Sequence, residues 1–176
     1  ADVNGRSGTI YVYRLRVEGA NGTLWEGLRA YYVDSSGNVE RIPVSYIYYN
    51  LKPVEGTPLN VDLSENDKVR TEALKDSYAK AEELRSEEEE VVAIMENEIK
   101  MRYTHEIEIL KHQGTRITQE IIQKLTKELS KEIEDLRKRI KAIRDCDPEL
   151  VAVIHLIPAR RDVDEEAKRE VELAGM

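Results

Sequence analysis

The side chains best suited to bind a metal ion lie close together in the second half of the chain. His105, Glu108 and His112 are spaced so that a helix would place them on one face. Imidazole and carboxylate groups are suitable zinc ligands. The spacing matches neither His-Glu-x-x-His nor the Glu-x-x-His of di-iron bundles, and nothing in the sequence places another carboxylate opposite these residues. We therefore favour a solvated polar face and expect no metal or other cofactor.

The single cysteine is a poor candidate for catalysis. Cys146 has no partner for an intrachain disulfide or a Cys-x-x-Cys site. Its neighbours Asp145 and Asp147 disfavour the thiolate that a nucleophile needs. His155, the nearest candidate base, lies in an apolar segment and is better explained as a hydrogen-bonded core residue. No Gly-x-Ser-x-Gly motif is present either, so the sequence leans away from an enzyme.

Aromatic residues gather at the start of the chain, where Trp25 and seven of the nine tyrosines lie within the first fifty residues. Several tyrosines alternate along expected strands and could form a stacking face for a sugar, a peptide or single-stranded nucleic acid. These candidate ligand-binding residues are Tyr11, Tyr13, Tyr31, Tyr46 and Tyr48. Because the chain has no phenylalanine, however, tyrosine must supply aromatic volume to the core. We favour the core role and keep the binding face as the alternative.

The elements that carry these tyrosines are predicted to be strands. Segments 9–17, 24–33 and 42–49 are rich in β-branched and aromatic residues, and the turn-forming segments 19–22 and 34–38 separate them. We expect a three-stranded antiparallel meander.

A proline and a second apolar segment add detail to the predicted sheet. Pro43 cannot donate a ladder hydrogen bond, so the third strand should lie at an edge or carry a bulge. Residues 51–63 are expected to form an irregular connector. Residues 150–157 are apolar without alternation, which is typical of a strand buried on both faces, and we place it inside the sheet. Residues 165–173 are predicted to form a short last helix.

Two long helices are predicted between the connector and the last strand. The first begins near Ser64, and its apolar residues recur at helical spacing until a break at 112–115. From Ile122 to Ile143 the apolar residues step by three and four, close to a heptad seam. Residues 64–111 carry 14 acidic and 8 basic groups, a net charge of −6, whereas residues 116–145 carry 6 and 9, a net of +3. The short break and the opposite charges predict an antiparallel pair.

The predicted fold class is therefore α+β: a small, mostly antiparallel sheet of about four strands packed with helices. A long antiparallel helical hairpin, resembling a coiled coil, is inserted before the last strand. Residues 1–63 and 146–176 would form the sheet domain. Residues 64–145 would form the hairpin, with its first turns packed on the sheet.

Composition excludes several classes of protein. The formal net charge of −8 opposes binding to nucleic acid, which makes such a partner unlikely on electrostatic grounds. No apolar run approaches the roughly 20 residues of a membrane span. We expect a soluble protein, either cytoplasmic or a mature secreted chain, because nothing near Ala1 resembles a signal peptide. The absence of phenylalanine also fits a designed chain, although the irregular connector and the lone Cys146 argue against that origin.

The sequence favours a non-enzymatic structural or adaptor protein that acts through its helical hairpin. A two-helix hairpin leaves apolar residues uncovered, so a homo-oligomer or another protein partner is expected. The candidate partner-binding residues are Leu125, Leu129, Ile133, Leu136, Ile140, Met101 and Ile109. The alternative is a small-molecule, peptide or carbohydrate site on the tyrosine-rich sheet face, with or without catalysis.

Overall fold

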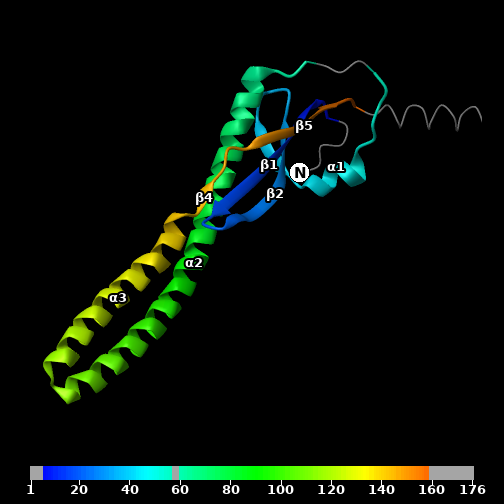
Figure 1. Cartoon of the computed structure of the whole chain (residues 1–176). Helices are drawn as coiled ribbons and strands as arrows, with labels where there is room; N and C mark the ends of the chain where they lie inside the picture. Colours follow the sequence, from blue (N-terminus) through cyan, green and yellow to red (C-terminus); the bar gives the residue numbers. More distant parts are fainter. Residues whose placement is uncertain (1–5, 57–59, 159–176) are drawn as a thin grey trace, which may run out of the picture. The chain divides into compact units, whose positions relative to one another are not determined.

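The computed structural model describes residues 6–56 and 60–158 and has an α+β fold (Figure 1). An antiparallel sheet is accompanied by one very long helix and a second helix, which confirms the predicted fold class. The strands are β1 (Gly8–Gly19), β2 (Gly22–Val33), β3 (Val39–Ile42), β4 (Arg144–Asp145) and β5 (Glu149–Leu156). The helices are α1 (Val44–Asn50), α2 (Leu63–Gln113) and α3 (Arg116–Lys141).

The chain forms two compact units. The first contains the described parts of residues 1–15, 27–74 and 148–176, and the second contains residues 16–26 and 75–147. Strands β1 and β2 and helix α2 therefore contribute residues to both units.

The sheet of the first unit has β1 at its centre. Strand β2 lies on one side of β1 and pairs in turn with β3, and β5 pairs with the other side of β1 in antiparallel register. One face of this sheet is apolar and is covered by α1 and the residues next to it. Its buried core residues are Ile10, Val12, Ala30, Tyr32 and Ile42.

The opposite face of the same sheet carries buried tyrosines. Tyr11 and Tyr31 are at most 1% exposed. The Tyr11 hydroxyl donates to Glu65 Oε1 of α2 over 2.9 Å, and the Tyr13 hydroxyl donates to Asn66 Oδ1. The first turns of α2 thus satisfy the polar ends of rings that the sheet buries.

The third predicted strand is only partly correct. Strand β3 ends at Ile42, and residues 44–50 form α1 instead of continuing the strand. Pro43, at φ −63°, is the N-cap of α1 and offers no N–H to a sheet ladder. The apolar residues of 42–49 fit a strand over this short span, but α1 packs Val44 and Ile47 on the core face as a helix. The edge position was expected for a strand that contains Pro43; β3 is the outermost strand of its side, but Pro43 lies outside it.

The last predicted strand is present, but the prediction that both its faces are buried is wrong. In the described part of the chain β5 pairs only with β1, so it lies at the edge of the sheet. Leu150 is 37% exposed and Val151 is 46% exposed. The register with β1 shifts opposite the Val12–Tyr13 step, which indicates a bulge. The predicted helix at 165–173 lies outside the described residues.

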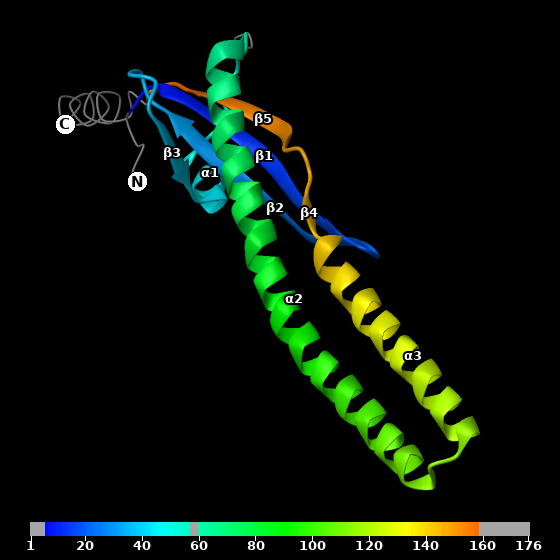
Figure 2. The same cartoon turned by 90° about the vertical axis from the view of Figure 1, so that its left-hand side faces the viewer.

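The second unit is built around the helical hairpin, by which we mean residues 75–113 of α2, the Gly114–Thr115 turn and α3. Both views show α2 and α3 side by side (Figures 1 and 2). Gly114 has a φ of 61°, and Thr115 caps α3 with its hydroxyl while Thr118 bonds back to the Thr115 amide. The predicted break at 112–115 is confirmed. Within the described residues, no helix is long and apolar enough to cross a membrane.

Candidate interaction surface on the helical hairpin

The apolar residues of α3 form a seam that faces α2. They recur every three or four residues and are half-buried, whereas the residues between them are mostly exposed. The seam consists of Leu125, Leu129, Ile133, Leu136 and Ile140. These five sequence-predicted partner-binding residues are therefore half-buried already within the single chain.

Ion pairs flank this seam and join the two helices. Arg137 Nε lies 2.6 Å from Glu96 Oε1, and Arg139 Nη2 lies 3.0 Å from Glu88 Oε1. The hydrogen bond from Arg137 lowers the pKa of the Glu96 carboxyl below its usual value. These two ion pairs join α3 to α2, and because both are partly exposed to solvent, each contributes only modestly to stability. A further pair joins Arg102 and Glu132.

The outer side of α2 carries apolar residues that no described part of the hairpin covers. Met101 is 73% exposed and Ile94 is 63% exposed, and their separation of seven residues corresponds to about two helical turns. Val91 and Ile109 are 47% and 49% exposed. We call Val91, Ile94, Met101 and Ile109 the outer stripe. Met101 and Ile109, predicted to bind a partner, are thus placed on an accessible surface.

The base of the hairpin is fixed by buried contacts. Val17, Ala81 and Ile143 form an apolar cluster that Trp25 and Leu84 border. Arg85, on the same helix as Ala81, donates from Nη2 to the Ile143 carbonyl over 2.7 Å and from Nε over 3.1 Å. These bonds satisfy a carbonyl that follows the end of α3.

Cys146 lies at the base of the hairpin, where its backbone groups make hydrogen bonds. Its amide donates to the Arg16 carbonyl over 2.9 Å, and its carbonyl accepts from the buried Ser77 hydroxyl at 3.4 Å. His155, the candidate base, lies on β5, where its Nδ1 is 3.4 Å from the Thr9 hydroxyl. Cysteine and histidine therefore have separate structural contacts.

The candidate metal ligands are all exposed on α2. His105, Glu108 and His112 lie near the turn of the hairpin. In the ranges that the structure describes, no three His, Cys, Asp or Glu side chains gather closely enough to hold a metal ion.

The five candidate ligand-binding tyrosines are divided among different surroundings. Tyr11 and Tyr13 are buried against α2, and buried Tyr31 meets Tyr13 edge to face with ring centroids 6.3 Å apart. Tyr46 is half-buried on α1, and Tyr48 is 82% exposed on that helix. The structure therefore does not place these rings together on one open sheet face.

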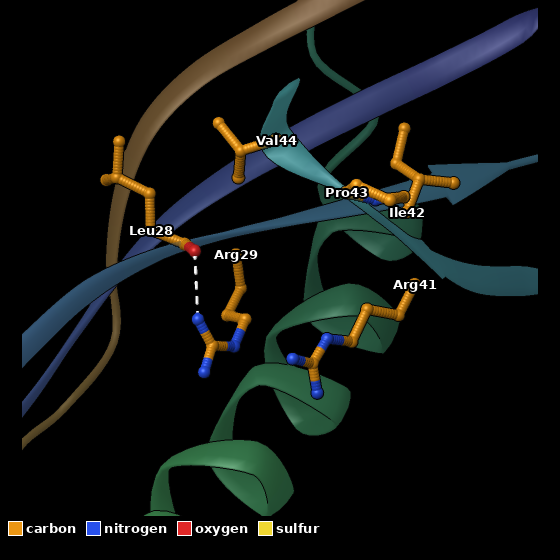
Figure 3. A pocket seen from close by; sticks show the side chains of 6 residues that line it. All are labelled: Leu28, Arg29, Arg41, Ile42, Pro43 and Val44. Carbon is orange, nitrogen blue, oxygen red and sulfur yellow. Dashed lines mark hydrogen bonds between the residues drawn. The ribbon is translucent and has the colours of Figure 1, made fainter. Parts of the chain in front are cut away.

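A pocket of about 380 Å³ lies in the first unit where β3 ends (Figure 3). Two arginines point side by side on one side of the strands, and apolar residues lie on the other side. The lining residues are Leu28, Arg29, Arg41, Ile42, Pro43 and Val44. Little in the sequence pointed to this pocket; the one signal is Pro43, which cannot donate a hydrogen bond to a sheet ladder.

Comparison with models of protein families, with curated proteins and with solved structures found no match for this chain.

Proposed function

We propose that this is a structural or adaptor protein whose helical hairpin is an assembly arm that binds a second copy of the chain. The observation that carries the proposal is the outer stripe, in which Ile94 and Met101 stay largely exposed although the seam of the same hairpin is packed. Fully burying a side chain of this size contributes about 1.5–3 kcal/mol. A helix from another molecule would cover the stripe.

Charge favours a second copy as the partner. Residues 75–113 carry 11 acidic and 6 basic groups, a net of −5, and α3 carries 5 and 8, a net of +3. Lys124, Lys127 and Lys131 are exposed on α3. An α3 from another chain would bring these lysines to the acidic surroundings of the outer stripe, and their aliphatic stems can cover apolar side chains.

The test compares matched charge insertions on α2. Wild-type protein should have a mass in light scattering of at least twice the 20.3 kDa of one chain. Ile94→Lys combined with Met101→Lys should give 20.3 kDa particles with unchanged helix content. Ala93→Lys is the control, because Ala93 is exposed next to Ile94 but points about 100° away around the helix.

A wild-type chain that stays at 20.3 kDa up to millimolar concentration contradicts the proposal. Equal dissociation by Ala93→Lys and by the double variant contradicts it as well, because the outer stripe would then have no special role. Variants in the seam, such as Leu129→Asp, would not serve here, since they break the hairpin itself.

A further inference from the structure

We infer that β5 pairs edge to edge with β5 of a second copy of the chain, in an antiparallel register centred on Ile154. The strand lies within the first unit, so this contact joins sheets and does not depend on the hairpin contact. If both contacts form, they link pairs of chains into larger assemblies; only that linkage rests on the proposed function.

The free edge of β5 supplies the main-chain groups for this contact. Within residues 6–56 and 60–158, β5 pairs with β1 alone (Figure 2). A strand with one neighbour has unpaired N–H and C=O groups along its other edge, and a further strand satisfies them in order. All eight residues of β5 are partly or largely exposed, so the other described parts of the chain do not enclose it.

The opposite edge of the sheet shows how such pairing is prevented. Strand β3 has only four residues and carries the exposed, charged Glu40 and Arg41. Short length and charged side chains are both devices that protect a sheet edge. The longer β5 has neither charge nor proline from Leu150 to Ile154. Its edge is therefore suited to an uncharged strand.

Most of β5 is regular enough to accept that strand. Its pairing with β1 is one to one from Ala152 to Leu156, and the bulge falls at Val151, near the start of the strand. A bulge can turn an edge away from a partner, but this one lies outside the regular stretch.

The exposed apolar side chains indicate the register. Val151 is 46% exposed, and Ile157, one residue beyond the strand, is 69% exposed. Both are three residues from Ile154, so a two-fold axis through Ile154 places Val151 of one copy opposite Ile157 of the other. Side chains directly opposite on antiparallel strands have Cβ atoms about 5 Å apart, so each would cover the other.

The neighbouring registers are less favourable. A centre at Val153 would place Ile157 opposite the charged Glu149. A centre at His155 would bring Pro158, which has no N–H, into the paired segment. The strand is thus complementary to itself in one register, and this favours a second copy over an unrelated segment.

The contact is small and should be weak. The paired segment covers residues 151–157 of each copy, far fewer than the roughly 20 to 30 residues that each partner contributes to a stable interface. We expect a dissociation constant of about 1 mM. The strands are then apart at micromolar concentration, where the masses of the hairpin variants are compared.

The test uses full-length protein that carries Ile94→Lys and Met101→Lys, which remove the hairpin contact. In sedimentation equilibrium, the average mass should rise from 20.3 kDa as the concentration approaches about 1 mM. Adding Val151→Lys and Ile157→Lys places like charges opposite each other and should weaken association at least about tenfold. Both positions are exposed in the single chain, so circular dichroism should show unchanged folding.

The matched variant combines Val151→Lys with Ile157→Glu in the same background. It is charged at the same two positions, but antiparallel pairing about Ile154 sets opposite charges across from each other. Its association should stay within about threefold of the starting protein. Val54→Lys, at another exposed position of the same unit, should also leave association unchanged.

A mass that stays at 20.3 kDa up to about 5 mM protein overturns the inference. Equal weakening by the two charged variants overturns it too, because the register about Ile154 predicts opposite results. Amide exchange of residues 152–156 that is equally slow at micromolar and millimolar concentration would show that the same chain covers this edge. Failure of the hairpin contact appears separately, as a wild-type chain that is monomeric at micromolar concentration.

Discussion

At the scale of single residues, two tyrosines on the same strand are anchored to α2 by different acceptors. The Tyr11 hydroxyl donates to the carboxylate of Glu65, and the Tyr13 hydroxyl donates to the amide oxygen of Asn66. A hydrogen bond to a charged group contributes more to stability than one to a neutral group. Tyr11 and Tyr13 can therefore be compared directly, because they lie on the same sheet face and differ in the charge of their acceptor.

Burial, followed by the hydrogen bond to Glu65, raises the pKa of Tyr11 well above its usual value of 10.0. An unfolded tyrosine loses its proton near pH 10, whereas the folded protein keeps the Tyr11 proton to higher pH. Stability from this group is thus complete below pH 10 and declines as the pH rises above it. We expect the free energy of unfolding in urea to fall between about pH 9 and pH 11, and Tyr11→Phe should reduce that fall.

The control for this pH dependence is Tyr13→Phe. The pKa of Tyr13 is also raised by burial, but the Arg70 charge and the Asn66 hydrogen bond oppose that shift. Removing the Tyr13 hydroxyl should therefore change the pH dependence of the free energy of unfolding less than removing the Tyr11 hydroxyl does. At pH 7, Tyr11→Phe should cost about 1.5 kcal/mol and Tyr13→Phe about 1 kcal/mol. A pH slope that is the same in wild type and Tyr11→Phe would show that other groups cause it.

At the scale of elements, the turn of the hairpin depends on one backbone conformation. Gly114 has a φ of 61°, and a Cβ added there would meet no atom within 4 Å. Gly114→Ala should therefore lower the free energy of unfolding by about 1 kcal/mol, solely because alanine resists this left-handed conformation. Urea denaturation followed by circular dichroism measures the change.

Gly56→Ala is the matched control. A Cβ at Gly56 also meets open space, but its backbone does not have this positive φ. We expect that substitution to be neutral or slightly stabilising, because alanine restricts the unfolded chain. Similar losses at both glycines would show that the turn conformation does not limit stability.

The sequence predicted the long elements better than the short ones. Periodicity sustained over many turns identified α2 and α3, and glycine followed by a capping threonine located the break between them. The seven residues of α1 are too few for a helical period to exceed an alternating one. The edge position of β5 depends on which strands pair, and an apolar run does not encode that choice.

The candidate interaction surface on the hairpin was also only partly predictable from the sequence. The heptad-like spacing correctly identified an apolar face on α3. The same spacing would result whether that face packs on α2 of its own chain or on a helix of a second chain. Only the structure shows which apolar residues remain outside, as Met101 does and Leu129 does not. The pocket at the end of β3 could not be predicted from the sequence, because its position depends on the exact residue at which that strand ends.

At the scale of the whole molecule, the sheet of the first unit and helix α3 of the second differ in how deeply they bury side chains. In the sheet, Ile10 and Tyr11 are fully buried, whereas Thr118 is the one buried residue of α3. We expect the amides of α3 to exchange with deuterium at free energies a few kcal/mol below those of β1, through local opening. Native-state hydrogen exchange on the Ile94→Lys, Met101→Lys double variant, in which assembly should not protect the hairpin, measures the difference.

Equal protection of α3 and β1 would contradict this expectation and indicate that the chain opens as a single cooperative unit. Stronger protection of α3 in wild type than in the double variant, with β1 unchanged, would locate the effect of assembly on the hairpin.

The position of the only tryptophan makes the base of the hairpin visible to spectroscopy without a label. Trp25 borders the Val17–Ala81–Ile143 cluster, and Lys80 Nζ lies 5.2 Å from its ring centroid. An indole beside a cation and packed on aliphatic groups emits differently from one in water. Its fluorescence therefore reports whether this base is closed.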